Sequence, residues 1–454
     1  MTESLEQWID REYRHAAAAM LRSVSACAIV KERPGFGRSV TPVAGSIVAS
    51  PVLAAYNPDP DYFFHWFRDS AIVIDAVRML YEAGQLGAEA LAHFADFVRF
   101  SLALRTLDGR ALDASTSWRR MVTPDFERYV RDDLATVFGD AVYADTRVNP
   151  DGTLDISRWP RPQHDGPPLR ALAVLRWLRA LRAARGEAGG AHEAVSAHTL
   201  AEAERLLRID LALTAAHWRE PSFDVWEEEL GLHYFTLRVA AAALNEGADW
   251  LRAAAEHSRA AALRTEALAV VETLDRFWLE DAGHYRSRIM PAGVSSTKTL
   301  DIAVILSAVR SGDAGGVHSA GDPRMHATLD RLERLFDGLY AINRERPRER
   351  GVAMGRYEGD VYYSGGAYYF ATLGAAELAF LAARAHAPQT EGRERWLARG
   401  DRFLAAVRAF TPASGDLSEQ FDQRTGEQTS AKHLAWSYAA FISSVTARRA
   451  LVSR

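Results

Sequence analysis

The chain has 454 residues, of which 48% are hydrophobic and 25% are charged, so it has ample apolar material for a large core and bulk disorder is excluded. Its formal net charge of −5 excludes the basic footprint of a nucleic-acid-binding protein. Cys27 is the only cysteine, which excludes an internal disulfide and favours a reducing compartment, the cytoplasm.

The first predicted element is an amphipathic helix close to the N-terminus. Residues 16–30 are apolar enough to resemble a secretion signal, but Arg14 and Arg22 interrupt the apolar run and acidic residues precede it. Leu5 and Ile9 recur at helical spacing on one face. No stretch of the chain reaches the roughly eighteen uncharged apolar residues of a membrane span, so no membrane contact is expected.

Apolar residues recur at helical spacing along almost all of the remaining chain, and alternation typical of strands is scarce. We predict about twelve helices from this periodicity. They begin near residues 3, 68, 89, 168, 195, 232, 251, 298, 325, 365, 395 and 430.

The connections between these helices alternate in length. The short ones fall near residues 84–88, 185–194, 247–250, 312–324 and 386–394. The long ones fall near residues 26–67, 107–167, 217–231, 278–297, 341–364 and 410–429. Alternation of this kind places every long loop at the same end of an up-and-down bundle, and compact domains rarely keep long loops without a function.

This alternation predicts an all-α fold in which six helical hairpins close into a ring, an (α/α)6 toroid. The toroid is expected to form a single domain over residues 1–454, with its long loops gathered over one mouth. An open solenoid of helix pairs fits the same pattern less well.

The first long loop ends in a segment, residues 57–69, that combines turn-forming residues, four large aromatic residues and the adjacent charges Arg68 and Asp69. Aromatic faces bind the apolar faces of sugars, and charged groups fix their hydroxyls by strong hydrogen bonds. The structural alternative is that Asp69 only caps the next helix and pairs with Arg68.

Four other long loops also carry unusual polar and aromatic residues. Residues 158–167 are too rigid and too polar for a passive connection, and we interpret them as a binding wall. The remaining segments are 226–229, 355–363 and 418–422. Each could serve packing or capping alone, and three consecutive glutamates before a helix are usually a solvated first turn.

Glu227 and Glu419 are the predicted catalytic pair. Hydrolysis of a glycosidic bond needs one carboxylic acid that protonates the leaving oxygen and one carboxylate that activates water or attacks the anomeric carbon. Glu427 lies in a second Glu-Gln dipeptide just beyond Glu419, and we expect it to cap the final helix instead.

Five segments in this order resemble the signatures of the glucoamylases, glycoside hydrolase family fifteen. They are Asp61-Tyr62-Phe63-Phe64-His65-Trp66-Phe67-Arg68-Asp69, Arg161-Pro162-Gln163-His164-Asp165-Gly166-Pro167, Asp224-Val225-Trp226-Glu227-Glu228, Gly355-Arg356-Tyr357 with Asp360, and Ser418-Glu419-Gln420 leading to Trp436-Ser437-Tyr438. The similarity covers essentially the whole chain. It implies an (α/α)6 toroid and an exo-acting, inverting hydrolase that releases glucose from the non-reducing ends of α-glucans.

The resemblance also implies roles for individual residues. Glu227 matches the general acid, whose carboxyl must be protonated, and Glu419 matches the general base. Arg68 and Asp69 match the pair that grips the terminal glucose. The other matched substrate-binding positions are Tyr62, Trp66, Trp159, Arg161, Trp226, Glu228, Arg356, Gln420 and Trp436.

Two departures from the family pattern concern the substrate. Ala367-Tyr368 stands where the fungal enzymes often have Pro-Trp, and His65 and Phe67 replace smaller polar residues, so the outer subsites and the entrance are expected to differ. No starch-binding module is recognised, which favours soluble oligosaccharides as substrates. We expect a monomer that needs no cofactor and no metal ion, since no His/Cys/Asp cluster has metal-ligand spacing.

Alternatives remain open on the sequence alone. The same machinery suits an α-1,6-glucosidase or a trehalase, because linkage preference is not legible from these motifs. A glucoamylase-like toroid can also persist as a non-catalytic glucan-binding or regulatory scaffold, although the presence of both carboxylates argues against this.

Overall fold

The computed structural model describes residues 3–55, 58–187 and 195–452. Within these ranges the chain forms thirteen α-helices, seven short 3-10 helices and twelve short strands. Asn57 and most of the predicted connection at residues 185–194 lie outside the described residues.

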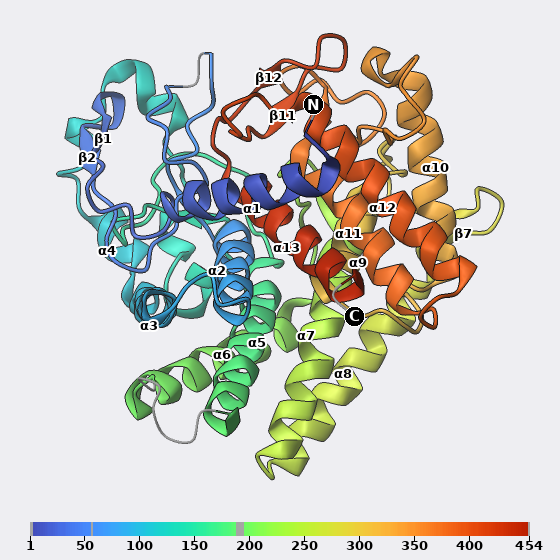
Figure 1. The fold of residues 1–454 in the computed structure, drawn as a ribbon. Helices are drawn as coiled ribbons and strands as arrows, with labels where there is room; N and C mark the ends of the chain where they lie inside the picture. The colour runs from blue at the N-terminus through green and yellow to red at the C-terminus, as the bar shows by residue number, and fades with distance from the viewer. Residues whose placement is uncertain (1–2, 56–57, 188–194, 453–454) are drawn as a thin grey trace.

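Six helices form an inner ring, and nearly all of their described side chains are buried (Figure 1). They are α2 (Phe67–Glu82), α5 (Gly166–Glu187), α7 (Tyr234–Ala253), α9 (Ala303–Ser311), α11 (Tyr369–Arg384) and α13 (Ala435–Val452). Each packs against the next in this order, and α13 packs against α2. The ring is therefore closed, which confirms the predicted toroid and rules out the open solenoid.

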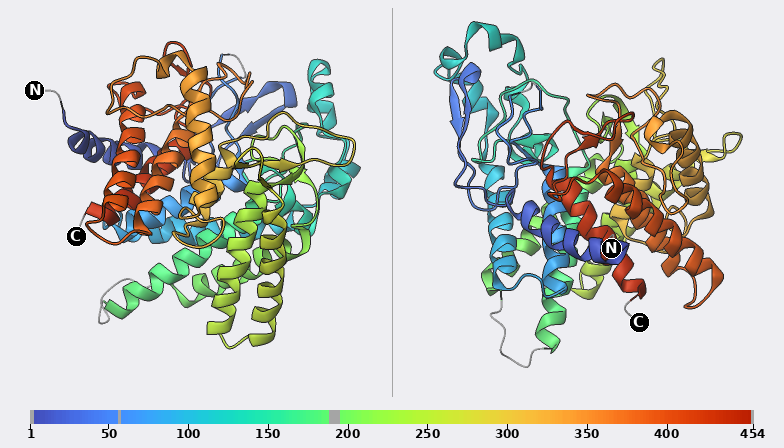
Figure 2. Two further views of the ribbon diagram at one scale, coloured as in Figure 1. Left: turned by 90° about the vertical axis from the view of Figure 1, so that its right-hand side faces the viewer. Right: turned by 45° about the horizontal axis from the view of Figure 1, so that its top comes forward.

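Six further helices lie outside this ring and each bury one face (Figures 1 and 2). They are α1 (Leu5–Leu21), α3 (Ala88–Ala103), α6 (Ala197–His217), α8 (His257–Asp275), α10 (Pro323–Leu339) and α12 (Glu391–Phe410). These twelve helices begin within six residues of the predicted positions, and only the starts of α8, α9 and α13 differ by more than the roughly two to four residues usual for boundaries read from sequence. The short helix α4 (Gly109–Ala114) was not predicted.

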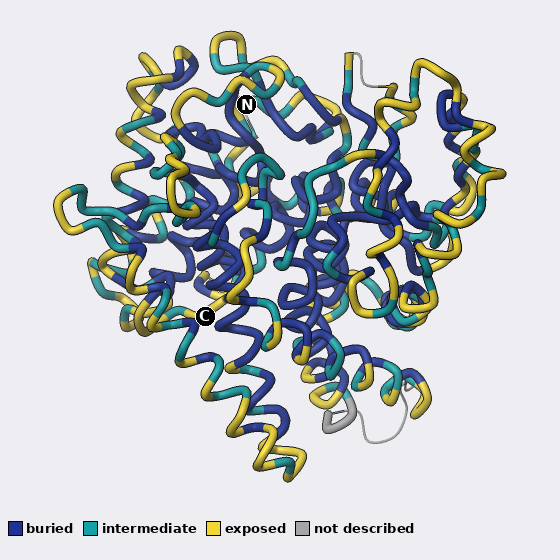
Figure 3. The backbone as a smooth tube through the Cα atoms, turned by 180° about the vertical axis from the view of Figure 1, so that it is seen from behind, coloured by how far each residue is buried: buried dark blue, intermediate teal, exposed yellow. Residues whose placement is uncertain are grey.

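The burial pattern follows from this two-layer arrangement. In Figure 3 buried backbone fills the centre of the molecule and exposed backbone lies on the outer helices and loop tips. Small residues let the inner helices approach closely: a Cβ atom added at Gly374 of α11 would lie 2.4 Å from Cδ2 of Leu306 on α9. A larger side chain at Gly374 would require Leu306 to change its conformation.

The strands are short antiparallel pairs that brace the loops. They are β1 (Lys31–Arg33) with β2 (Arg38–Val40), β3 (His65–Trp66) with β4 (Arg147–Val148), β5 (Ser222–Phe223) with β6 (Leu230–His233) and β9 (Arg288–Ile289), β7 (Trp278–Leu279) with β8 (His284–Tyr285), and β10 (Ala367–Tyr368) with β11 (Gln420–Phe421) and β12 (Gln428–Thr429). Three of the strands, β3, β6 and β10, end directly before the inner helices α2, α7 and α11. Pairing therefore fixes the long loops at the N-terminal ends of the inner helices.

Local sequence signals set the helix ends. Ser4 and Gln7 form a capping box at the start of α1, with Ser4 Oγ accepting from the Gln7 N–H at 3.2 Å. Gly312 takes a left-handed conformation (φ 79°) directly after α9, which stops that helix.

Among the residues that the structure describes, no helix combines the length and the apolar character needed to cross a bilayer.

Glu12 is the one glutamate on the buried face of α1, which packs against α13. Both of its carboxyl oxygens are buried without a hydrogen-bond partner. Burial raises the pKa of Glu12 to about 7 from an ordinary value of 4.5. Because the folded state holds this proton more tightly than the unfolded state, Glu12 lowers the stability progressively as the pH rises from about 4.5 to above 7.

Glu12→Gln is expected to remove this loss of stability at high pH, since the amide of glutamine carries no charge to desolvate. At pH 8 the variant should be more stable than wild type by up to about 3 kcal/mol, and at pH 5 the two should be nearly equal. Thermal unfolding at both pH values measures the difference. Glu6→Gln, at an exposed position of the same helix, is the control and should shift Tm equally at both; a pH-independent effect of Glu12→Gln would contradict the prediction.

Candidate active site

One pocket opens where the long loops meet the N-terminal ends of the inner helices. Its volume is about 250 Å³, and its wall is formed mainly by aromatic and charged side chains. The lining residues are Ala49, Tyr62, Trp66, Arg68, Asp69, Trp159, Pro160, Val225, Trp226, Glu227, Glu228, Arg356, Tyr362, Phe370, Glu419, Leu434 and Trp436. The pocket is small compared with the roughly 300–1,000 Å³ of drug-sized ligand sites, which suits the end of a chain.

Glu227 lies at the tip of the hairpin between β5 and β6, and not in a solvated first turn of a helix. Asp224 holds this tip, because its Oδ1 accepts from the Glu228 N–H at 2.7 Å and its Oδ2 pairs with Arg288 at 2.9 Å. Glu227 itself takes a left-handed conformation (φ 64°). Such backbone is uncommon for a residue with a side chain and recurs at functional sites.

Three donors converge on the carboxyl group of Glu227. Trp66 Nε1 and Arg68 Nη2 donate to its Oε1 at 2.7 Å and 3.0 Å, and Trp159 Nε1 donates to its Oε2. An indole or a guanidinium can donate but not accept, so the Glu227 carboxyl oxygens are the acceptors in all three contacts.

Glu419 lies directly before β11, only 8% exposed, and faces a set of hydroxyl groups. Tyr62 OH donates to it at 3.2 Å, and Ser430 Oγ donates to its Oε2. Burial raises the pKa of Glu419 to about 7, while the hydrogen bond from Ser430 and the charge of Arg356 act in the opposite sense. The pKa of Tyr62 is itself raised, first by burial and then by Glu419 and, more weakly, by Glu227, so Tyr62 lies within electrostatic reach of both carboxyl groups.

Ser430→Ala is expected to move the acidic side of the kcat/KM profile to higher pH. The hydrogen bond from Ser430 stabilises the Glu419 carboxylate, so its loss should raise the pKa of Glu419 further, by roughly one unit. The measurement is kcat/KM on maltotriose between pH 4 and pH 9. Ser364→Ala is the matched control, because Ser364 Oγ donates to the neighbouring Gln420 and not to Glu419; equal profiles for the two variants would contradict the prediction.

Arg68 and Asp69 lie in the first turn of α2, and both are buried. Arg68 pairs with Asp69 at 3.4 Å and with Asp165 at 3.3 Å. Burial raises the pKa of Asp69 to about 6, against the opposing effect of Arg68. The 3.4 Å ion pair joins Arg68 Nε to Asp69 Oδ2, and neither of these buried atoms has a hydrogen-bond partner, so the two charges at this point of the pocket wall face each other without a hydrogen bond.

A second charged group lies across the pocket. Arg356 bonds Asp360 through Nε at 2.7 Å and pairs with Glu228 at 3.0 Å. Although burial acts to raise it, the pKa of Glu228 lies below its usual value because of Arg356, Lys298 and Tyr357. A carboxylate and a guanidinium fixed in this way suit hydrogen bonding to sugar hydroxyls.

Two tryptophans are stacked against Phe370 on the same wall. The rings of Trp436 and Phe370 are 4.2 Å apart at 10°, and those of Trp226 and Phe370 are 6.1 Å apart at 27°. Trp226 Nε1 also donates to Asp301 at 2.9 Å. Their orientations are therefore fixed by contacts within the protein, which leaves flat apolar faces for a sugar ring.

Eleven of the thirteen predicted site residues line this pocket, and Arg161 and Gln420 are not among the lining residues. Gln420 is fully buried in β11, where its Nε2 donates to Tyr368 OH at 2.6 Å. Arg161 pairs with Asp145 and with Asp155, the latter at 2.9 Å. Glu427 is exposed beside β12, away from α13, so its predicted role as the cap of the final helix is wrong.

Three important residues were not predicted as site residues. Tyr362 lines the pocket and bonds Tyr62 OH at 2.8 Å, Ser430 contacts Glu419, and Asp165 pairs with Arg68. The Tyr-Tyr pair and the Gln-His-Asp run were visible in the sequence as unusual loop segments. Ser430 gave no signal, because a single serine in a polar loop fits many roles.

In a comparison with protein-family models, residues 37–106 and 144–446 match a family described as glycosyl hydrolases family 15. Residues 107–143, which contain α4 and most of the 3-10 helices, lie outside the matched ranges. All of the pocket-lining residues lie inside them.

Several curated proteins are similar along most of the chain. Glucoamylase 1 of Rhizopus oryzae is 25% identical over 98% of this chain and 71% of its own length. A probable glucoamylase of Schizosaccharomyces pombe is 25% identical over 99% of this chain and 93% of its own. The intracellular, sporulation-specific glucoamylase of Saccharomyces cerevisiae is 24% identical over 97% and 83% of the two chains.

Solved structures share the fold. The glucoamylase of Hormoconis resinae superimposes with a TM-score of 0.75 at 26% identity, covering 98% of this chain and 74% of its own. The glucoamylase of Saccharomycopsis fibuligera gives a TM-score of 0.76 at 20% identity, covering 99% of this chain and 96% of its own, a likeness of the fold alone.

Proposed function

The chain belongs to glycosyl hydrolases family 15, and from that membership we propose that its pocket cleaves α-glucans with Glu227 as general acid and Glu419 as general base. The protein is a glycoside hydrolase of the glucoamylase type, which releases glucose from the non-reducing ends of α-glucans. The observation that carries the proposal is the convergence of both glutamates and of the Arg68 and Asp69 pair on one small pocket.

The terminal glucose of the substrate would be held by Arg68 and Asp69. Arg68 would donate to a sugar hydroxyl and Asp69 would accept from one, which would give hydrogen bonds to two atoms that have none in the ligand-free chain. The stacked faces of Trp226 and Trp436 would cover the apolar face of the ring. Because the pocket is small, only a chain end is accommodated, and attack from the end of the chain follows.

In the chemical step Glu227 would give its proton to the glycosidic oxygen while the bond from that oxygen to the anomeric carbon breaks. Glu419 would take a proton from a water molecule whose oxygen bonds to the anomeric carbon from the opposite face. The leaving chain departs with the proton of Glu227, and the product is β-glucose. Because water displaces the leaving oxygen in a single step and attacks from the opposite face, the anomeric configuration is inverted.

The two glutamates have different surroundings in the ligand-free chain. Three donors surround Glu227, whereas burial raises the pKa of Glu419 to about 7. Family membership supports our assignment, under which Glu227 must hold the proton once substrate is bound. Hydroxyls of the sugar that donate to Asp69 would stabilise its carboxylate and so make a proton of this cluster available to Glu227.

Proton NMR of the purified protein with maltotriose, followed before mutarotation, tests the proposal. We expect β-glucose to appear first, and initial α-glucose would contradict the inverting mechanism. Isomaltotriose and α,α-trehalose in parallel distinguish an α-1,6-glucosidase or a trehalase. If none of the three substrates yields glucose, the result would favour the non-catalytic scaffold.

The proposal also covers the cellular location, the oligomeric state and the substrates. A cytoplasmic location is supported by the single cysteine and by the similarity to the intracellular glucoamylase of Saccharomyces cerevisiae. One catalytic domain is supported by the closed ring of six inner helices, and a monomer is proposed with it. Soluble oligosaccharides are the proposed substrates.

A further inference from the structure

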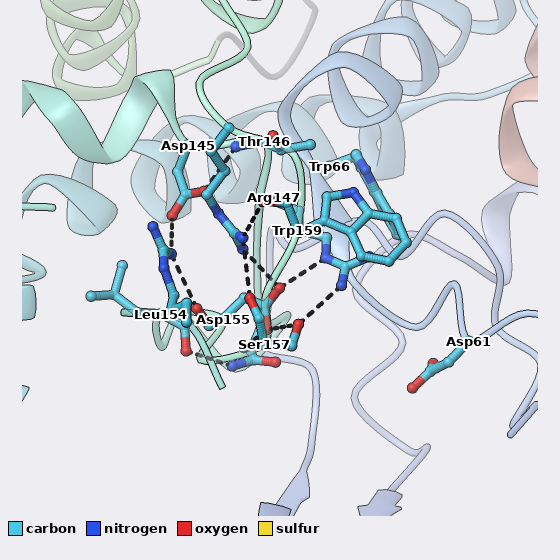
Figure 4. Close-up of polar contacts among 12 residues, drawn as sticks. Asp61, Trp66, Asp145, Thr146, Arg147, Leu154, Asp155, Ser157 and Trp159 are labelled. Carbon is cyan, nitrogen blue, oxygen red and sulfur yellow. Dashed lines mark hydrogen bonds and ion pairs between the residues drawn. The ribbon is translucent and has the colours of Figure 1, made fainter. Parts of the chain in front are cut away.

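Arg147 lies behind the pocket wall and does not line the pocket, and its neighbours include both indoles that donate to Glu227. It is in β4, where it pairs directly with Trp66 of β3. Its side chain is only 1% exposed. Figure 4 shows its guanidinium beside the side chains of Trp66 and Trp159.

The guanidinium lies over three aromatic rings. Its central carbon is 3.6 Å from the ring centroid of Trp159, 3.9 Å from that of Phe64 and 4.7 Å from that of Trp66. The rings of Trp66 and Trp159 are 6.2 Å apart and nearly perpendicular, at 76°. A planar cation against these faces limits how far either indole can tilt.

Arg147 is itself fixed from the other side. Its Nε donates to Asp155 Oδ2 at 2.9 Å and its Nη2 donates to Ser157 Oγ at 3.1 Å. Although burial acts to raise it, the pKa of Asp155 lies well below its usual value because of Arg147 and Arg161. Asp155 is thus an anion shared by two arginines, and it holds the plane of the Arg147 guanidinium.

Arg161 fixes the backbone of the same wall. Its Nη1 donates to the carbonyl oxygens of Ser157 and Trp159 at 3.1 Å and 3.2 Å, and its Nη2 donates to Asp155 at 2.9 Å. Arg161 therefore places the backbone of Trp159, whereas Arg147 contacts its ring.

We propose that Arg147 is a positioning residue that orients the indole N–H groups of Trp159 and Trp66 toward the Glu227 carboxyl. This inference rests on the proposed function, because it concerns the proton that Glu227 delivers. Arg147 acts through the two rings, since it does not line the pocket. Its charge and its planar shape both contribute, which a lysine would reproduce only in charge.

The charged groups that face Glu227 are Arg68 of α2 with the carboxyls of Asp69 and Asp165. Arg68 and the two indoles all donate hydrogen bonds to the carboxyl group of Glu227. If the indoles tilt away, these hydrogen bonds weaken and Glu227 keeps its proton to a higher pH. The alkaline side of the kcat/KM profile, which reports loss of that proton, should then move upward.

Arg147→Lys is the first test, measured on maltotriose with full pH profiles and with Tm from thermal unfolding. We expect kcat to fall by about tenfold to a hundredfold, and the alkaline side of the profile to rise by about half a pH unit. Arg170→Lys is the matched control. Arg170 is equally buried, is paired with Asp210 at 2.7 Å and lies 4.4 Å from the Tyr143 ring, but the rings it touches do not contact Glu227.

A double-mutant cycle with Trp159→Phe tests whether Arg147 acts through the indole. Phenylalanine keeps an aromatic ring but removes the N–H, so the effect of Arg147→Lys on the alkaline side should shrink in that background. Additive effects of the two substitutions would overturn the inference. So would an Arg147→Lys variant that loses Tm as Arg170→Lys does but keeps the wild-type kcat and pH profile.

Ser157→Ala replaces Arg147→Lys if the lysine variant does not fold, because it removes only one of the two anchors of the guanidinium. It should move the alkaline side in the same direction by less, and an unmoved profile in a folded Ser157→Ala variant would overturn the inference. The wild type in the same assay separates the two proposals: a wild type without glucose release overturns the proposed function, whereas an active wild type with an unresponsive Arg147 overturns this inference alone.

Discussion

Glu227→Gln is expected to lower kcat on maltotriose by about 10²- to 10⁴-fold with little change in KM. An amide cannot give a proton to the glycosidic oxygen, whereas the groups that bind the sugar stay in place. The same variant should retain far more of its activity on α-glucosyl fluoride, because fluoride departs with little need for a proton. Initial rates on both substrates measure this difference.

Glu229→Gln is the matched control for this variant. Glu229 belongs to the same glutamate triplet, but its carboxylate pairs with Arg288 at 2.8 Å and does not line the pocket. The kcat of the Glu229→Gln variant should stay close to that of wild type, and its Tm should be lower because the ion pair with Arg288 is weakened. Equal losses on maltotriose and on α-glucosyl fluoride in Glu227→Gln would contradict the role of general acid.

Glu419→Gln is expected to lose about 10²- to 10⁴-fold in kcat on both substrates. Water must be deprotonated as it attacks the anomeric carbon, whichever group leaves, so a good leaving group cannot replace the base. Binding of maltotriose, measured by calorimetry, should persist, because Arg68 and Asp69 are unchanged. Glu427→Gln, in the exposed second Glu-Gln dipeptide, should behave as wild type.

The two substitutions together decide the assignment of the roles. If Glu419→Gln keeps its activity on α-glucosyl fluoride and Glu227→Gln loses it, the roles are reversed. The raised pKa of Glu419 would then agree with the role of general acid.

The helices were predictable because each inner helix carries long apolar runs and each long loop interrupts them. The sequence also placed Glu227, Glu419 and nine of their neighbours at one mouth, since alternating loop lengths and the family motifs agree. The short helix α4 was missed, because its six residues are too few to show helical periodicity.

The remaining errors concern partners that are distant in sequence. Arg161 was interpreted as a sugar ligand, yet it is paired with Asp145 and Asp155 behind the pocket wall. Its motif shows that an arginine belongs there but not whether the side chain points into the pocket or away from it. Ser430 was missed for the same reason, because its contact with Glu419 depends on the pairing of β11 with β12.

The closure of the ring between α13 and α2 has a consequence for the order in which the protein is synthesised. A nascent chain has Arg68, Asp69 and Glu227 outside the ribosome well before Glu419, and Trp436 follows last of all. Until residues 435–452 have emerged, α2 lacks one neighbour and the apolar face it will bury stays accessible to chaperones. The growing polypeptide therefore has no complete pocket, and hydrolysis begins only after the last inner helix has docked.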